Sequence, residues 1–119
     1  MADRTEELMD ANLRRVFGER DPERRRVAIE DTYTRDVVFS DPEETVSGWD
    51  ALDRKAQGLL DGAPGFAFSA DGPVRRAQDL ALLAWRFGPP GQDPVVRGID
   101  VAEVRDDRIA RLWAVLVRD

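Results

Sequence analysis

The period of the apolar residues constrains this chain more than any other feature, because it changes from helical to alternating along the sequence. Residues 5–17 carry apolar side chains at helical spacing, and Gly18 is a typical helix end. Asp21-Pro22 predicts the start of a second helix, since a capping Asp is followed by Pro at the first helical position. After Asp36 the apolar residues alternate, as in a half-buried strand. The first third of the chain therefore predicts two helices and then a strand.

A third helix and a series of strands follow. Ser47-Gly48 leads into an apolar stripe at helical spacing that ends near Gly62. Beyond it, the predicted strands are residues 66–77, with a bulge or break at 71–73, then 80–87, 95–104 and 109–117. This order predicts an α+β fold with the helices packed on one face of an antiparallel sheet. At 119 residues, the chain suits a single domain spanning residues 1–119.

Composition argues against several classes of function. With 24 acidic and 18 basic residues, the net charge of -6 argues against a nucleic-acid partner. The one basic run, residues 24–26, is interpreted as the solvated face of a helix start. No apolar run is long enough to span a membrane and the N-terminus does not resemble a secretion signal, so we expect a cytoplasmic location and no membrane contact.

The absence of Cys and His narrows the available chemistry. No thiolate nucleophile or sulfur-ligated metal is available, and both the commonest general base and the commonest zinc ligand are missing. Any catalysis would therefore rest on Asp, Glu, Tyr, Lys or Arg, and the sequence implies no metal and no cofactor.

Two acidic residues occupy positions where burial is expected. Asp41, in VVFSDP, follows Val37 and Phe39 on the inner face of the first predicted strand. Its alternative interpretation is an Asx-type turn, because it precedes Pro42. Asp100, in GIDVAEV, lies mid-strand between apolar neighbours, so desolvation would disfavour its charged form. A neutral acid can donate a hydrogen bond that a carboxylate cannot.

The last predicted strand is apolar on both faces. One face carries Leu112, Ala114 and Leu116, and the other carries Trp113, Val115 and Val117. Because the helices can cover only one face, the sequence predicts a homodimer through the outer face that includes Trp113. The alternative is that Trp113 packs under a loop of its own chain.

The order of these parts resembles a known superfamily. A helix, an Asp-Pro-capped helix, a strand ending in DP, Ser-Gly before a helix, and strands with GIDVAEVRDDRI near the end resemble the nuclear transport factor 2-like proteins. The resemblance is nearest to the SnoaL-like and ketosteroid isomerase-like branches. It implies a cone-shaped, cystatin-like α+β domain, with three N-terminal helices packed on a strongly curved, mainly antiparallel sheet.

The resemblance also implies roles for the two acids. Asp41 matches the carboxylate that shuttles a proton in the isomerases, and Asp100 matches the protonated acid that donates a hydrogen bond to the developing oxyanion. The isomerases place a second donor, a Tyr, where this chain has Leu13. Tyr33 could reach the pocket from the second helix, although a core position for it is the alternative.

A second branch, the limonene epoxide hydrolases, resembles this chain less closely. Its Asp-Arg-Asp cluster would require Asp100 together with Arg97 or Arg86, and strand parity places Arg97 on the opposite face from Asp100.

The expected function is that of a SnoaL-like domain that binds a compact hydrophobic small molecule in an apolar pocket. The expected catalytic pair is Asp41 and Asp100, acting in proton transfer of the isomerase or cyclase type. The expected pocket residues are Leu13, Phe17, Tyr33, Phe39, Leu112 and Leu116. The alternatives are a non-enzymatic ligand-binding or dimerisation domain of the same fold, and water activation as in the epoxide hydrolases.

Overall fold

The structure, a computed structural model, describes residues 3–117. The helical segments are α1 (Thr5–Ala11), a π-helical segment η1 (Asn12–Phe17), α2 (Pro22–Thr32) and α3 (Trp49–Asp61). The strands are β1 (Tyr33–Ser40), β2 (Thr45–Ser47), β3 (Ala67–Ala70), β4 (Arg75–Ala77), β5 (Leu80–Gly88), β6 (Val96–Arg105) and β7 (Arg108–Val117). The predicted α+β class is confirmed. Within the described range, no helix combines the length and hydropathy that a membrane span requires.

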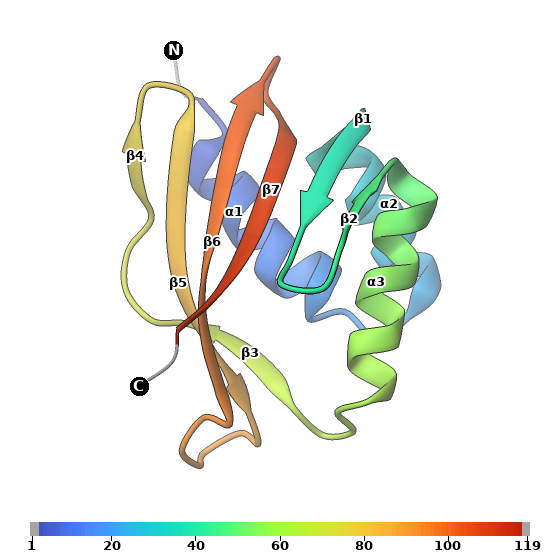
Figure 1. The fold of residues 1–119 in the computed structure, drawn as a ribbon, viewed down its shortest axis with the longest axis vertical. Helices are drawn as coiled ribbons and strands as arrows, with labels where there is room; N and C mark the ends of the chain where they lie inside the picture. The colour runs from blue at the N-terminus through green and yellow to red at the C-terminus, as the bar shows by residue number, and fades with distance from the viewer. Residues whose placement is uncertain (1–2, 118–119) are drawn as a thin grey trace.

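All the strands belong to one sheet of order β2-β1-β7-β6-β5-β3, with β4 also paired to β5. The pairings are antiparallel except that of β1 with β7, which is parallel. Figure 1 shows α1 passing behind β6 and β7, and α3 beside the hairpin of β1 and β2. The helices pack their apolar side chains against the inner face of the sheet, where the core lies.

One predicted helix boundary was wrong. Tyr33, expected on the second helix, instead begins β1, where its extended backbone pairs with Ile109 of β7. The reason is local, because an aromatic and a β-branched residue, Tyr33 and Thr34, favour strand over helix. The break expected at residues 71–73 is present: β3 and β4 are separate strands because the turn around Gly72, with φ of 130°, interrupts the pairing with β5.

The first predicted helix is present, but its second half is wider than an α-helix. Residues Asn12–Phe17 form a π-helix, and Gly18 follows as the helix end. A Cβ atom at Gly18 would lie 2.9 Å from the carbonyl oxygen of Leu13, so glycine permits this close approach. Because π-helical turns are frequent at functional sites, the first residue of the segment, Asn12, is of interest.

The basic run at residues 24–26 is only partly a solvated surface, which corrects the prediction. Arg25 is 2% exposed. Its Nε donates to Asp53 Oδ1 at 2.7 Å, one Nη donates to the carbonyl of Glu19 at 2.7 Å, and the other donates to Gln57. Arg25 therefore joins α2 to α3 and to the loop before α2.

Replacing Arg25 with methionine is expected to lower the free energy of unfolding by about 3 kcal/mol, because Asp53 and Gln57 lose their buried partner. Urea denaturation monitored by circular dichroism would measure the change. The matched control is Arg24→Met, since the Arg24 side chain is 71% exposed and its ion pairs lie in solvent. An equal effect of both substitutions would contradict the structural role of Arg25, because exposed pairs contribute less than about 1 kcal/mol.

Candidate functional site

A cavity of about 300 Å³, hereafter the chamber, lies between the helices and the inner face of the sheet. Most of its wall is apolar, and the lining residues are Leu13, Phe17, Phe39, Asp41, Pro42, Glu43, Leu59, Phe68, Trp85, Asp100, Ala114 and Leu116. The side chain of Glu43 is largely exposed, whereas Asp100 is 6% exposed. The chamber therefore has an acidic rim and one buried carboxyl at its inner end.

Asp100 lies in the middle of β6, between β5 and β7. Asn12 Nδ2 donates to one carboxyl oxygen at 2.8 Å, and Trp85 Nε1 donates to the other at 2.9 Å. Burial raises the pKa of Asp100 to about 7, although these two donors act in the opposite direction. At neutral pH the carboxyl therefore exists in both forms and can give or take a proton.

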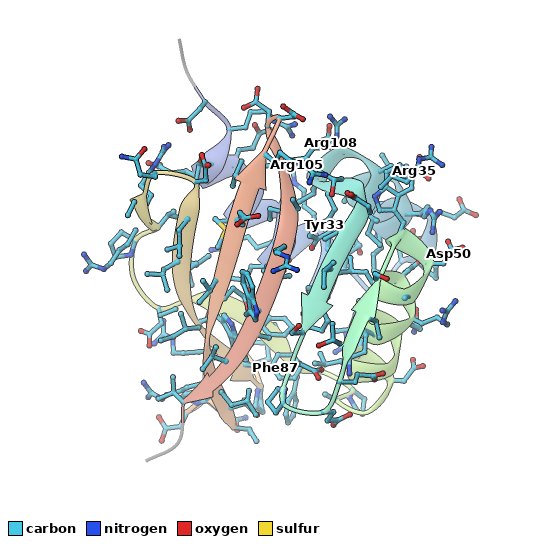
Figure 2. The ribbon with its side chains drawn as sticks, turned by 45° about the horizontal axis from the view of Figure 1, so that its top comes forward. Tyr33, Arg35, Asp50, Phe87, Arg105 and Arg108 are labelled. Atoms are coloured by element: carbon cyan, nitrogen blue, oxygen red, sulfur yellow. The ribbon has the colours of Figure 1, made fainter. Side chains whose placement is uncertain are left out.

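Asn12 connects Asp100 to a second buried group. The amide is fully buried in η1, and its Oδ1 accepts a hydrogen bond from the Tyr33 hydroxyl. Burial raises the pKa of Tyr33, and the charge of Asp100 raises it further, so the phenol remains protonated. Tyr33, Asn12, Asp100 and Trp85 thus form a continuous polar chain from β1 through η1 to β6 and β5, and Figure 2 labels Tyr33 beside β7.

Asp41 has a different environment at the rim of the chamber. One carboxyl oxygen accepts the backbone N–H groups of Glu43 and Glu44 at 2.9 and 3.0 Å, which makes an Asx-type turn. The other oxygen lies 2.6 Å from Lys55 Nζ. Partial burial by itself would raise the pKa of Asp41, but the hydrogen bonds from Lys55 and the two amides outweigh it and lower the pKa. Asp41 is therefore ionised and is a weak base.

The chamber includes most, but not all, of the residues predicted from the sequence. Both acids line it, together with Leu13, Phe17, Phe39 and Leu116. Tyr33 and Leu112 do not, because both are buried in the core behind the wall.

Sequence reasoning missed Asn12 and Trp85, the two donors to Asp100. An asparagine inside a helix is unfavourable without a buried partner, and that is the available signal for Asn12. The sequence pattern presents Trp85 only as part of an apolar strand. The sequence feature that could have pointed to Trp85 is Gly98, two residues before Asp100. In the structure, Gly98 pairs with Trp85 across the strands and leaves room for the indole.

The charged groups expected for an Asp-Arg-Asp cluster do not meet. Arg97 and Arg86 both lie near Asp71, at 3.6 and 3.9 Å, and their side chains are about half exposed. Asp100 receives its hydrogen bonds from Asn12 and Trp85 instead, so the epoxide hydrolase arrangement is not formed. No group of three or more acidic side chains within residues 3–117 is placed to hold a metal ion.

Comparison with known proteins agrees with this architecture. The family model of the SnoaL-like domain matches residues 11–112. A search of the curated proteins finds no significant match. Among solved structures, a proposed isomerase of the SnoaL-like family from Agrobacterium tumefaciens has a TM-score of 0.86 at 22% identity, covering 94% of this chain and 96% of the other.

Two further structures share the fold. A proposed polyketide cyclase from Acidithiobacillus ferrooxidans has a TM-score of 0.75 at 17% identity, over 99% of this chain and 91% of the other. A proposed ketosteroid isomerase from Kribbella flavida has a TM-score of 0.73 at 16% identity, over 98% and 79%. The resemblance to the nuclear transport factor 2-like proteins is confirmed, and since the family model spans most of the sequence, the chain belongs to the SnoaL-like family.

Proposed function

We propose that the chamber binds a compact, mainly hydrophobic molecule with a carbonyl group, and that Asp100 moves a proton on the carbon skeleton next to that carbonyl. One observation carries the proposal, namely a buried carboxyl at the inner end of an apolar chamber with a pKa of about 7. A proton-transfer group works best when its pKa lies near the working pH. The volume of about 300 Å³ is at the small end of the range for ligand pockets, which favours a compact ligand.

The proposed step needs no other reactant. Ionised Asp100 takes a proton from the carbon next to the carbonyl, and the C–H electron pair moves into the enolate. The same carboxyl, now protonated, returns the proton to another carbon of the conjugated system, which completes an isomerisation. Proposed isomerases and proposed polyketide cyclases are among the structural relatives, which supports the choice of reaction class.

The roles of the two acids differ from those that the family resemblance implies. We assign the proton transfer to Asp100, because the lowered pKa of Asp41 and its ion pair with Lys55 make Asp41 the weaker base. Asp41 and Lys55 are assigned to the rim, where they would orient polar groups of the ligand.

A panel of small β,γ-unsaturated cyclic ketones tests this function. We expect the protein to convert at least one of them to the conjugated ketone, measured by ultraviolet absorbance, and to exchange deuterium from D₂O into the carbon next to the carbonyl, measured by mass spectrometry. Binding of these ketones without isomerisation and without exchange would contradict catalysis and favour the alternative, a ligand-binding domain.

We further propose a homodimer through the outer face of the sheet around Trp113. Among residues 3–117, no helix lies in front of β6 and β7 in Figure 1, and Val115 on that face is 47% exposed. Uncovered apolar sheet surface of this kind commonly marks a contact between copies.

Val115→Glu is expected to weaken self-association by roughly a hundredfold or more, because it places a charge at the centre of an apolar contact. Sedimentation equilibrium over a concentration series would measure the change. Val27→Glu is the matched control, since Val27 is 72% exposed on α2, away from this face. A monomeric wild type, or equal loss in both variants, would contradict the proposed dimer.

A further inference from the structure

The side-chain amide of Asn12 forms hydrogen bonds with two different partners, one through its oxygen and one through its nitrogen. Its Oδ1 accepts the Tyr33 hydroxyl, and its Nδ2 donates to Asp100 Oδ2 at 2.8 Å. Asn12 and Tyr33 are both fully buried. An asparagine amide can rotate by half a turn and exchange its donor and acceptor ends, so its partners decide which end faces Asp100.

Tyr33 decides the orientation of this amide. Its phenol is protonated, since burial and the nearby charge of Asp100 both raise its pKa. A buried hydroxyl hydrogen needs an acceptor, and Asn12 Oδ1 is the acceptor that it has. Rotating the amide would leave that hydrogen without a partner. The N–H end of Asn12 is therefore held toward Asp100.

This orientation determines where the proton of Asp100 can point. Asn12 Nδ2 and Trp85 Nε1 each face one carboxyl oxygen, and neither nitrogen can accept a hydrogen bond. When Asp100 is protonated, its O–H therefore has no acceptor in either neighbour and is free for a molecule in the chamber. With the amide rotated, Asn12 Oδ1 would capture that proton instead.

We propose that Tyr33 is a positioning residue, which fixes the amide of Asn12 so that Asp100 presents its proton to the chamber. This inference rests on the proposed function in one respect, namely that a ligand in the chamber receives the proton of Asp100. The arrangement of donors is a property of the protein without ligand.

Few other titratable groups face Asp100. Asp41 and Glu43 line the same chamber from the loop between β1 and β2, and Asp41 is held ionised by Lys55. Among the described lining residues, β5 and β7 contribute no charged side chain to the wall. A change in the pKa of Asp100 caused by replacing Tyr33 therefore has to be distinguished only from the titration of Asp41 and Glu43, the other two carboxyls that line the chamber.

Tyr33→Phe keeps the ring and removes the hydroxyl. We expect the pKa of Asp100 to rise by about one unit, because its protonated form gains Asn12 Oδ1 as an acceptor while its ionised form loses an oriented donor. The measurement is the titration of ¹³C-carboxyl aspartate signals by NMR without ligand, with the Asp100 signal assigned by its absence in Asp100→Asn. Thr32→Val is the matched control, since it removes a neighbouring buried hydroxyl without a hydrogen-bond partner among the described residues, and the pKa of Asp100 is expected to stay unchanged.

A double-mutant cycle tests whether Tyr33 acts through Asn12. In the Asn12→Ala background, Tyr33→Phe is expected to leave the pKa of Asp100 unchanged. An equal shift in that background, or no shift in Tyr33→Phe alone, would overturn the positioning role. Because the readout uses no substrate, failure of the ketone assay leaves this test intact, and failure of this test leaves the proposed reaction standing.

Discussion

Asp100→Asn is expected to lower the isomerisation rate by about a hundredfold to ten-thousandfold, the usual contribution of a general acid–base group. Asparagine keeps the size of the side chain but can neither take nor release a proton at neutral pH. The measurement is kcat for the best ketone from the panel, with binding followed separately through tryptophan fluorescence. Binding is expected to persist, because the apolar wall of the chamber is unchanged.

The same substitution should change how stability depends on pH. The pKa of Asp100 in the folded protein is about 7, against an ordinary value of 3.8, so the folded state binds this proton more tightly than the unfolded state does. Its contribution is fully present below about pH 4 and is lost as the pH rises through 7. The free energy of unfolding lost in this way is on the order of 4 kcal/mol, since each unit of pKa shift corresponds to about 1.36 kcal/mol. Denaturation between pH 4 and 8 should show this fall in the wild type and not in Asp100→Asn.

Asp41→Asn provides the matched comparison. Since Asp41 is already ionised and held by Lys55, we expect its replacement to lower kcat by less than about tenfold. A larger loss in Asp41→Asn than in Asp100→Asn would reverse the assignment and restore Asp41 as the base, the role that the family resemblance implies. Activity lost in Asp100→Asn with stability retained would show that the loss is chemical.

The periodicity of the sequence is sufficient to predict that both acids lie on the chamber side of the sheet, with Asp100 inside β6 and Asp41 directly after the end of β1. The alternation of Val37 and Phe39 along β1, which points to Asp41 one residue beyond the strand, is a local property, and so is the position of Asp100 between apolar neighbours in β6. Each depends only on residues adjacent in sequence. The inner face of the sheet, and therefore one wall of the chamber, could be predicted for that reason.

The partners of these acids could not be predicted in the same way. Asn12 and Asp100 are 88 residues apart, and periodicity specifies a face but not the side chain that meets it from another element. Lys55 of α3, whose Nζ lies 2.6 Å from Asp41, is likewise a partner that the periodicity of the sequence does not indicate. Which carboxyl keeps its proton depends on these long-range contacts, so the sequence could suggest the pair but not the division of roles.

Gly98→Val is expected to cost about 3 kcal/mol of unfolding free energy or more, because a side chain at this position overlaps the indole of Trp85. A Cβ atom at Gly98 would lie 2.2 Å from Cζ2 of that ring. The ring has little room to move, since it also packs edge-on against Phe68 with centroids 5.3 Å apart. Displacing it would remove the hydrogen bond to Asp100, so we also expect the pKa of Asp100 to rise and the rate to fall.

The test combines urea denaturation with a cycle that removes the obstacle. In the Trp85→Leu background, Gly98→Val is expected to cost much less than in the wild type, because the atoms that it meets are gone. Gly58→Ala is the control for glycine replacement in general, since nothing lies within 4 Å of a Cβ at that helical position, and it should stabilise the protein by about 0.5–1 kcal/mol. An equal loss of unfolding free energy in both backgrounds would mean that the larger side chain is incompatible with strand β6 for a reason other than contact with Trp85. If Gly98→Val destabilises only the protein that has Trp85, the absence of a side chain at Gly98 is what lets the indole lie against Asp100. Gly98, which does not line the chamber, would then be needed for the geometry of the proton-transfer site.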